Sequence, residues 1–229
     1  MKRFFELLFG GYFFCLFQLA VQRIIPARCL RLEKLAFFRL DRSKQYRVSQ
    51  DETLDIRCGG VTDVDILARD LHNNDESFRK LYEYLYGEDV KPWIAKREEK
   101  AVGVVWLYQG YYIAPWQDYD GYILRLEIEP TARFVANVTV ASECRRQGIF
   151  SRIVAHFLGE LPNEEVYSAI GEDNTLSIRA HEKIGFRRCG AVYYIQIFGK
   201  TWAIFRTRRG ISRCFRMPQG KTISVVLSR

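Results

Sequence analysis

The segment 137–186 constrains the fold of this chain more than any other part of the sequence. It begins with the strand pattern 137–140, continues through a polar turn that contains Gly148, and then shows a helical pattern. A strand, a glycine turn and a helix in this order leave backbone N–H groups unpaired at the helix start, where they converge on an anion. We therefore expect a turn that can hold a pyrophosphate.

The size of the chain fits one α/β domain with an extension. It has 229 residues, of which 48% are hydrophobic, which is enough to bury the core of such a domain. The polar stretch 45–51 is the best candidate for the boundary between the extension and the domain. We expect residues 1–50 to form an apolar and basic helical extension, and residues 51–229 to form the domain with a basic C-terminal tail.

The six cysteines give no sign of a disulfide framework or a metal site. They form no C-x-x-C pair, and no histidine lies beside them at metal-ligand spacing. We interpret them as free thiols in a reducing cytoplasm and expect no bound metal. They are Cys15, Cys29, Cys58, Cys144, Cys189 and Cys214.

Charge is unevenly distributed along the chain. Residues 1–50 carry ten Lys/Arg and three Asp/Glu, and residues 200–229 carry eight Lys/Arg and no Asp/Glu. Against the total of +8, this leaves a net charge of −7 for residues 51–199. Both ends are therefore basic and the centre is acidic. Charge is the only feature that favours nucleic-acid binding, and we expect none because no recognition motif accompanies it.

The segment 4–20 is almost wholly apolar and is followed by regularly spaced arginines and lysines. As a helix it would cover roughly 25 Å, slightly less than a ~30 Å hydrocarbon core. It carries no cleavage site of the kind that ends a signal peptide. An apolar wedge with a cationic collar suits peripheral contact with the cytoplasmic face of an anionic membrane. The alternative is an amphipathic helix packed on the domain or on the second subunit of a homodimer.

The rest of the sequence alternates between strand and helix patterns. Thr62 can cap one helix, and Asp75 can cap a second over 76–86. The segments 92–97 and 102–107 are typical of an antiparallel hairpin. This order of elements predicts a mixed sheet flanked by helices.

Two motifs stand in register across the segment 137–186. In the first, a strand ending in valine leads into an Arg/Gln-x-x-Gly-x-Gly/Ala turn, matched here by Val140, Arg145, Gly148 and Phe150. In the second, Asn-x-x-Ala-x-x-x-Tyr-x-x-x-Gly-Phe, the matching positions are Asn174, Ser177, His181, Gly185 and Phe186. Together with the element order they resemble the GNAT superfamily of acetyl-coenzyme A-dependent N-acyltransferases, over roughly residues 52–205.

This resemblance implies a GNAT-like α/β fold with a mixed, mostly antiparallel sheet, and acetyl-CoA as cosubstrate. It implies that the Val138 and Val140 backbones face the pantetheine arm, and that Asn174 and Ser177 belong to the cofactor site on its other side. The pyrophosphate would be held by the guanidinium of Arg145 and by the amides of Gln147, Gly148, Ile149, Phe150 and Ser151. At Phe150 the family usually has a small residue.

Catalysis in this family is implied to be direct attack by a neutral amine, without an acyl-enzyme. His181 occupies the position of a tyrosine that protonates the coenzyme A sulfur, so it is either that acid or a packing residue. We choose Glu127 as the general base. The other candidate carboxylates are Glu129, Glu172 and Asp173.

The function that follows is a bacterial-type N-acetyltransferase that transfers acetyl from acetyl-CoA to a primary amine. An amino sugar or a surface-polysaccharide intermediate would suit an enzyme that is located at a membrane. Two alternatives stay open, namely acetylation of protein lysines or N-termini, and a non-catalytic module that binds coenzyme A.

Overall fold

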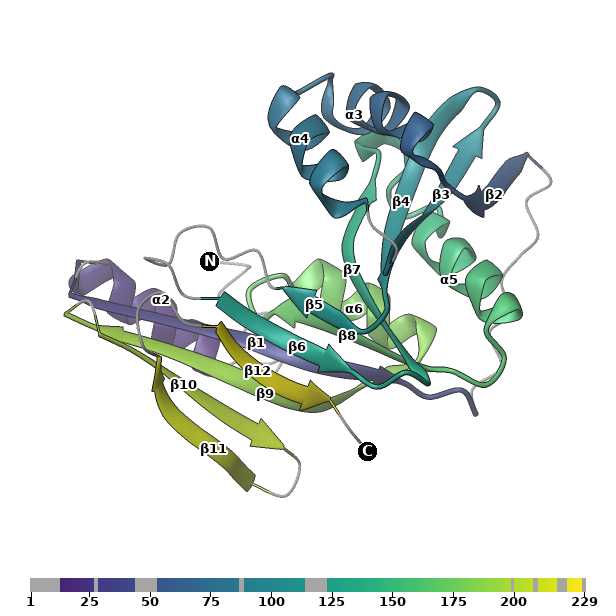
Figure 1. Cartoon of the computed structure of the whole chain (residues 1–229). Helices are drawn as coiled ribbons and strands as arrows, with labels where there is room; N and C mark the ends of the chain where they lie inside the picture. Colours follow the sequence, from purple (N-terminus) through teal and green to yellow (C-terminus); the bar gives the residue numbers. More distant parts are fainter. Residues whose placement is uncertain are drawn as a thin grey trace. The chain divides into compact units, whose positions relative to one another are not determined.

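The computed structural model describes residues 13–26, 29–43, 53–86, 89–113, 123–198, 200–207, 210–217 and 222–227 (Figure 1). The chain divides into two compact units. Unit 1 comprises Met1–Arg39, Ile113–Arg125 and Ala169–Ser224, and unit 2 comprises Leu40–Tyr112, Leu126–Ser168 and Val225–Arg229.

Unit 2 is built on strands in the order β8-β7-β4-β3-β2. Neighbouring strands run antiparallel except β7 and β8, which are parallel. Their bounds are β2 Leu54–Cys58, β3 Val90–Arg97, β4 Lys100–Tyr108, β7 Ala132–Val140 and β8 Glu165–Gly171. The expected hairpin is confirmed as β3 and β4, and the mostly antiparallel sheet is confirmed as well.

Helices cover both faces of the unit 2 sheet. Gly103 of β4 lies against α5 (Ile149–Glu160), whereas Trp106 stacks on Tyr82 of α4 (Glu76–Leu85) with ring centroids 5.4 Å apart. Successive strand side chains alternate between faces, so these two positions, three residues apart, point in opposite directions. Since β4 is buried from Ala101 to Tyr108, it forms the centre of the unit 2 core.

The helix starts in unit 2 confirm one predicted cap and correct another. Asp75 caps α4 by accepting a hydrogen bond from the Ser77 N–H at 2.8 Å, as expected. The cap expected at Thr62 is wrong, because a 3-10 turn (Val61–Asp63) precedes α3 (Val64–His72). At this helix start the buried Asp63 carboxylate accepts hydrogen bonds instead, from the Gly60 N–H at 2.9 Å and from the Arg57 guanidinium.

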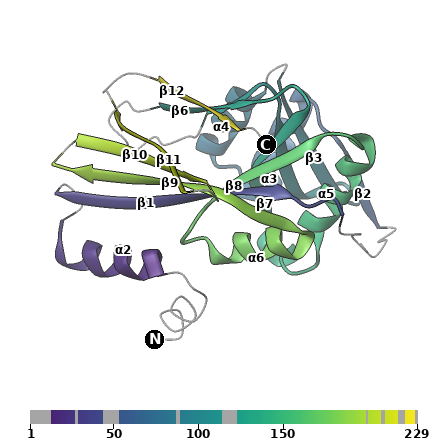
Figure 2. The ribbon, with the colours of Figure 1, turned by 90° about the horizontal axis from the view of Figure 1, so that it is seen from below.

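Unit 1 has the strand order β11-β10-β9-β1-β8, in which β8 contributes residues 169–171. Figure 2 shows the two helices among the described residues of unit 1, α2 and α6, on one face of these strands. The bounds are α2 Phe13–Ile24, β1 Leu30–Leu40, α6 Thr175–Ile184, β9 Phe186–Ile197, β10 Lys200–Thr207 and β11 Gly210–Met217. No described helix is long and apolar enough to cross a bilayer.

The strand β1 differs from the helical extension expected for residues 1–50. Leu32, Ala36, Phe38 and Leu40, at even-numbered positions, are buried at 6% exposure or less, which follows the two-residue period of a strand, although Phe37 is buried as well. The arginines between the apolar residues read as a helical collar in the sequence, but Arg39 falls on an odd position and is exposed.

A separate three-stranded sheet has the order β12-β6-β5, from β5 Tyr111–Ile113, β6 Ile123–Ile128 and β12 Thr222–Leu227. The boundary expected at 45–51 lies outside the described residues. Four cysteines, Cys29, Cys58, Cys144 and Cys189, are free thiols, as predicted.

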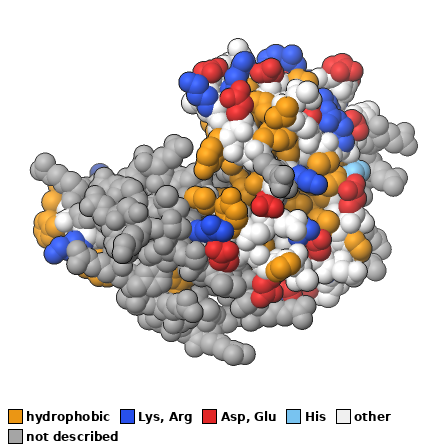
Figure 3. Space-filling model, in the orientation of Figure 1, with side chains coloured by type: hydrophobic (Ala, Val, Ile, Leu, Met, Phe, Trp, Pro, Cys, Tyr) orange, Lys and Arg blue, Asp and Glu red, His pale blue; other side chains and the backbone are white. Residues whose placement is uncertain are grey.

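One end of unit 1 carries exposed apolar side chains. Ile24, at the end of α2, is 82% exposed, and Phe198, after β9, is 77% exposed. Figure 3 shows hydrophobic side chains beside a cationic one at the far left, the end where Figure 1 draws the tips of α2, β9 and β10.

Candidate functional site

The turn between β7 and α5 has the geometry of an anion site. Gly148 adopts φ 78°, in the left-handed region, and α5 begins at the next residue. No side chain caps this helix, and its first turn contains no acidic residue. A Cβ built on Gly148 would meet no atom within 4 Å, so space is open in front of the helix start. The amides of Ile149, Phe150 and Ser151 therefore face an accessible, electropositive point.

Two exposed arginines precede this helix start. Arg145 donates from Nε to the Val140 carbonyl at 3.4 Å, which holds its guanidinium beside the end of β7. Arg146 adopts φ 68°. The turn thus adds two positive charges to the partial charge of the helix start, and this combination favours a phosphate ligand.

The β3–β4 hairpin braces the turn from outside. Lys100 pairs with Glu143 at 3.0 Å, and Arg97 donates to the Gln147 side-chain oxygen at 3.2 Å. The Gln147 amide group in turn donates to the Glu143 carbonyl at 2.9 Å. The backbone N–H of Glu143 and the Lys100 ammonium lower the pKa of the Glu143 carboxyl to about 2. Sequence reasoning missed Arg97 and Lys100, because nothing local connects them with residues more than forty positions away.

Gly103 sets the distance between β4 and the start of α5. A Cβ at this position would lie 2.8 Å from the Ile149 side chain, which is closer than real Cβ contacts come. A glycine within an otherwise apolar strand is the signal that could have found this close approach. Phe150 is 8% exposed, so its ring belongs to the core and its amide stays at the helix start.

Strand β7 contains a bulge at Asn137. Val104 pairs with Thr139 and Trp106 with Ala136, so Val105 alone stands opposite Asn137 and Val138. Asn137 adopts φ 48°, and its side-chain amide donates to the Tyr108 hydroxyl at 2.6 Å. Bulges of this kind re-aim the strand that follows and are common beside functional sites.

Beyond the bulge, one edge of β7 is not covered by β8. The two strands pair from Ala132 to Val135 only, as far as the described residues go. The Ala141 N–H donates to the Val102 carbonyl at 3.0 Å, toward β4. Because backbone groups alternate in an antiparallel ladder, those of Val138 and Val140 face away from β4. This edge offers hydrogen-bonding groups to an extended ligand.

In unit 1, the second motif begins α6. Asn174 caps this helix, with its side-chain oxygen accepting from the Ser177 N–H at 3.1 Å. Gly185, at φ 99°, ends the helix in the left-handed conformation. The two ends of the motif therefore serve the start and stop of α6 itself.

His181 is held inside unit 1. It is 2% exposed, and its Nδ1 lies 2.8 Å from the Ser177 carbonyl, which can only accept, so Nδ1 carries a proton. Its ring packs near Phe38 and Phe186. Burial lowers the pKa of His181 to about 4, so the ring is neutral at neutral pH and Nε2 has no proton to give. This geometry favours the packing alternative over the proton donor.

The four candidate carboxylates differ in their surroundings. Glu172 is buried and pairs with Lys34 at 3.3 Å and with Arg188 at 2.8 Å, so it anchors the β8–α6 turn to β1 and β9. Glu127 lies near the end of β6 and Glu129 directly follows that strand, both partly exposed. The site roles of these residues stay predictions.

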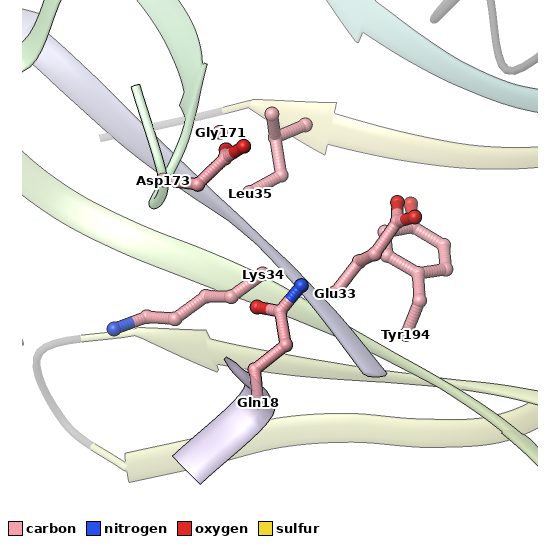
Figure 4. Close-up of a pocket in the computed structure, with 7 residues that line it drawn as sticks. All are labelled: Gln18, Glu33, Lys34, Leu35, Gly171, Asp173 and Tyr194. Atoms are coloured by element: carbon pink, nitrogen blue, oxygen red, sulfur yellow. The ribbon is translucent and has the colours of Figure 1, made fainter. Parts of the chain in front are cut away.

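Asp173 lines a pocket of about 290 Å³ that lies wholly in unit 1 (Figure 4). Figure 4 shows Glu33 and Tyr194 together on one side and Lys34 extending in the opposite direction. Gln18 of α2 completes the polar lining. Since the Lys34 ammonium pairs with Glu172, the pocket presents two carboxylates, those of Glu33 and Asp173, and an amide.

Comparison with protein-family models finds one match. The model described as acetyltransferase (GNAT) family matches residues 62–186. This stretch includes both motifs and the anion site of unit 2. A comparison with curated proteins found no match.

Solved structures that match the chain include a functionally unknown conserved protein from Staphylococcus epidermidis, with a TM-score of 0.52 and 14% identity, covering 78% of this chain and 66% of that one. An acetyltransferase of the GNAT family from Colwellia psychrerythraea has a TM-score of 0.48 and 11% identity, and the match covers 73% of this chain and 56% of that one. The third structure is AAC(6′)-Iy in complex with the bisubstrate analogue CoA-S-monomethyl-acetylneamine. Its TM-score is 0.43 and its sequence identity 19%, and the match covers 58% of this chain and 90% of that one. The chain thus spans no more than about two thirds of the first two proteins.

Proposed function

Because the chain belongs to the GNAT acetyltransferase family, we propose that it transfers an acetyl group from acetyl-CoA directly to a primary amine. The observation that carries this proposal is the uncapped start of α5, which lies behind the open space at Gly148 and beside two exposed arginines. Acetyl-CoA, when bound, supplies the activated acetyl group. The residues of unit 2 bind and orient it.

The pyrophosphate of acetyl-CoA fits the residues of the α5 turn. Arg145 and the amides of Gln147, Gly148, Ile149, Phe150 and Ser151 would hold it, as the sequence predicts. Two observations support this assignment: the first turn of α5 contains no acid that would repel the phosphates, and the Phe150 ring is buried in the core. The side chain of Gln147 is used to brace the turn, so its contribution would come from the backbone.

The pantetheine arm is an extended chain with amide groups, and the uncovered edge of β7 suits it. Val138 and Val140 would donate and accept backbone hydrogen bonds there, and the bulge at Asn137 supports an opening of the sheet at this point. In unit 1, Asn174 and Ser177 stay predicted cofactor contacts. The Asn174 oxygen is engaged by its own helix, which leaves its NH2 group as donor.

The reaction needs a neutral amine and a proton for the departing thiolate. Glu127 is the proposed base, and this choice rests on the family resemblance. The neutral, buried state of His181 weighs against its role as acid. It also supports the second candidate function, a non-catalytic module that binds coenzyme A.

We propose an amino sugar, or an intermediate of surface-polysaccharide assembly, as the acceptor. The carboxylates in the unit 1 pocket support a cationic ligand, since Glu33 and Asp173 can accept hydrogen bonds from an ammonium group. Acetylation of a protein lysine or N-terminus is the alternative. The exposed Phe17, Arg23 and Ile24 of α2 support a peripheral position on the inner face of a membrane.

Calorimetric titration with acetyl-CoA tests the central proposal. In Arg145→Glu we expect the Kd for acetyl-CoA to rise roughly 10- to 100-fold, because a charge-assisted hydrogen bond is lost and repulsion replaces it. Lys80→Glu, an equal charge change at an exposed position of α4, is the matched control and should leave the Kd unchanged. If the wild type does not bind acetyl-CoA at millimolar concentration, both candidate functions are excluded, namely the acetyltransferase and the non-catalytic module that binds coenzyme A.

Thiol release then separates the two candidates. Amino sugars, polyamines and lysine peptides are offered to the wild-type protein with acetyl-CoA. Turnover with an amino sugar supports the proposed acceptor class, and turnover with peptides alone would replace it. Binding of acetyl-CoA without release of thiol above the hydrolysis background for any amine would favour the non-catalytic module.

A further inference from the structure

We propose that the exposed end of unit 1 is a docking surface for an anionic lipid bilayer. This surface, the apolar tip, consists of Ile24, Pro26, Ile197 and Phe198, flanked by the cations Arg23 and Lys200. It rests on the peripheral membrane position proposed above and adds to the end of α2 a second contact from the distant β9–β10 turn, which supplies Ile197, Phe198 and Lys200.

The members of the apolar tip come together from two parts of the chain. The Phe198 N–H donates to the Cys29 carbonyl at 3.0 Å, which fastens the β9–β10 turn to the segment between α2 and β1. Figures 1 and 2 agree that the end of α2, the start of β1 and the end of β9 lie at the same end of unit 1. Ile24 is 82% exposed and Phe198 77%, so both side chains stand in solvent.

The backbone at Phe198 is strained. Ile197 pairs with Lys200, so only two residues connect β9 and β10. Phe198, the first of them, adopts φ 45°, in the left-handed region. Turns of this length favour Asn or Gly at such a position, and an aromatic residue there is unusual. A phenyl ring held at a strained position while its surface faces water gains little from the fold, so its partner is expected outside unit 1.

The charge near the apolar tip selects the partner. The segments 19–32 and 197–207 contain five Lys/Arg and no Asp/Glu, and the described cations Arg23 and Lys200 are exposed. Apolar side chains that project beyond a cationic rim match the interface of a bilayer containing anionic lipids, where the rings enter the acyl boundary and the cations stay among the headgroups. A specific protein partner would need about 800 Å² on this side, far more than a few side chains at one turn provide.

Single exposed apolar residues elsewhere need no such partner. Leu176, on α6, is 75% exposed and stands at the first turn of its helix, which is ordinary for a protein surface. Because its exposure nearly equals that of Phe198, Leu176 is a matched control for the effect of removing one exposed apolar side chain.

Vesicle co-sedimentation of the 229-residue chain tests the proposal. Wild type, Phe198→Asn and Leu176→Asn are mixed with vesicles of phosphatidylcholine alone or with 30% phosphatidylglycerol, roughly the share of anionic lipid that gives a negative surface potential. Asn tolerates the left-handed conformation, so Phe198→Asn should fold at least as stably as the wild type. We expect wild type and Leu176→Asn to bind the anionic vesicles, and Phe198→Asn to bind at least threefold more weakly.

Three outcomes would overturn the proposal. They are absence of wild-type binding to anionic vesicles, equal binding by Phe198→Asn with a melting temperature no lower than that of the wild type, and wild-type dimers in solution that Phe198→Asn converts to monomers. The last would assign the apolar tip to a second copy of the chain. The Kd for acetyl-CoA is measured in the same variants, and we expect it unchanged, so failure of membrane docking is distinguishable from failure of the proposed cofactor site.

Discussion

The turn before α5 leaves its helix start uncapped and its arginines exposed, whereas the turn before α6 caps its helix with Asn174 and precedes a buried histidine. Both turns carry a motif of the same family. In unit 2 the polar groups face open space, and in unit 1 most of them are satisfied by their own helix. A motif match therefore identifies a shared architecture, while the hydrogen-bond partners decide which of its residues are available for a ligand.

Glu172→Gln probes the anchoring of the second turn and should have the largest effect. Removal of the buried charge leaves Lys34 and Arg188 without their carboxylate, and we expect a loss of about 3 kcal/mol in the free energy of unfolding. Denaturant titration measures it. Glu182→Gln, at an exposed position of α6, is the control and should change stability little. Equal stability of wild type and Glu172→Gln would mean that Glu172 is not an anchor, and its role as a candidate base would then be the one left to test.

The pH dependence of stability tests the assignment of His181. Its pKa lies near 4 in the folded state, below the ~6.5 of an exposed histidine, so the unfolded chain binds this proton more tightly. The resulting stability is fully present above pH ~6.5 and is lost as pH falls toward 4, by up to about 1.4 kcal/mol per pH unit. His181→Gln should flatten this part of the profile.

Turnover of the same variant sharpens the comparison. If His181 is a packing residue, His181→Gln should keep the kcat of the wild type within a few-fold once the folded fractions are matched. If His181 donates the proton to the thiolate, kcat should fall by roughly 10²-fold or more while the Kd for acetyl-CoA stays the same. The second result would restore the proton donor predicted from the sequence.

Gly103→Ala perturbs the first turn with the smallest expected effect. The added methyl group would lie 2.8 Å from the Ile149 side chain and would push the start of α5 away from β4. We therefore expect a loss of about 1 kcal/mol in the free energy of unfolding and a several-fold weaker affinity for acetyl-CoA. Gly159→Ala, at the far end of the same helix and with no atom within 4 Å, is the matched control. A variant with wild-type affinity would show that this packing does not position the helix start.

Local sequence patterns predicted much of the fold. Two strand-like segments on either side of the polar residues 98–100 indicated the β3–β4 hairpin, Asp75 indicated the start of α4, and Gly148 indicated the start of α5. These features depend on residues within a few positions of one another. Family resemblance added the identity of the anion expected at α5.

What the sequence could not predict depends on contacts between distant segments. The environment of His181 is made in part by Phe38, which lies in a stretch expected to be helical, so neither its burial nor its lowered pKa was foreseeable. The bracing of the α5 turn by Arg97 and Lys100 likewise joins residues that are far apart in the chain. The period of two in β1 was present in the sequence, but the arginines between the apolar residues concealed it.

The position of β1 in the strand order delays its pairing during biosynthesis. Its neighbours are β8 and β9, and β8 begins at Glu165, roughly 125 residues after β1 ends at Leu40. At about 5–20 residues per second, the ribosome needs roughly 6–25 s to deliver the first of these neighbours. During that interval the apolar side chains of the nascent strand lack their final partners in the sheet.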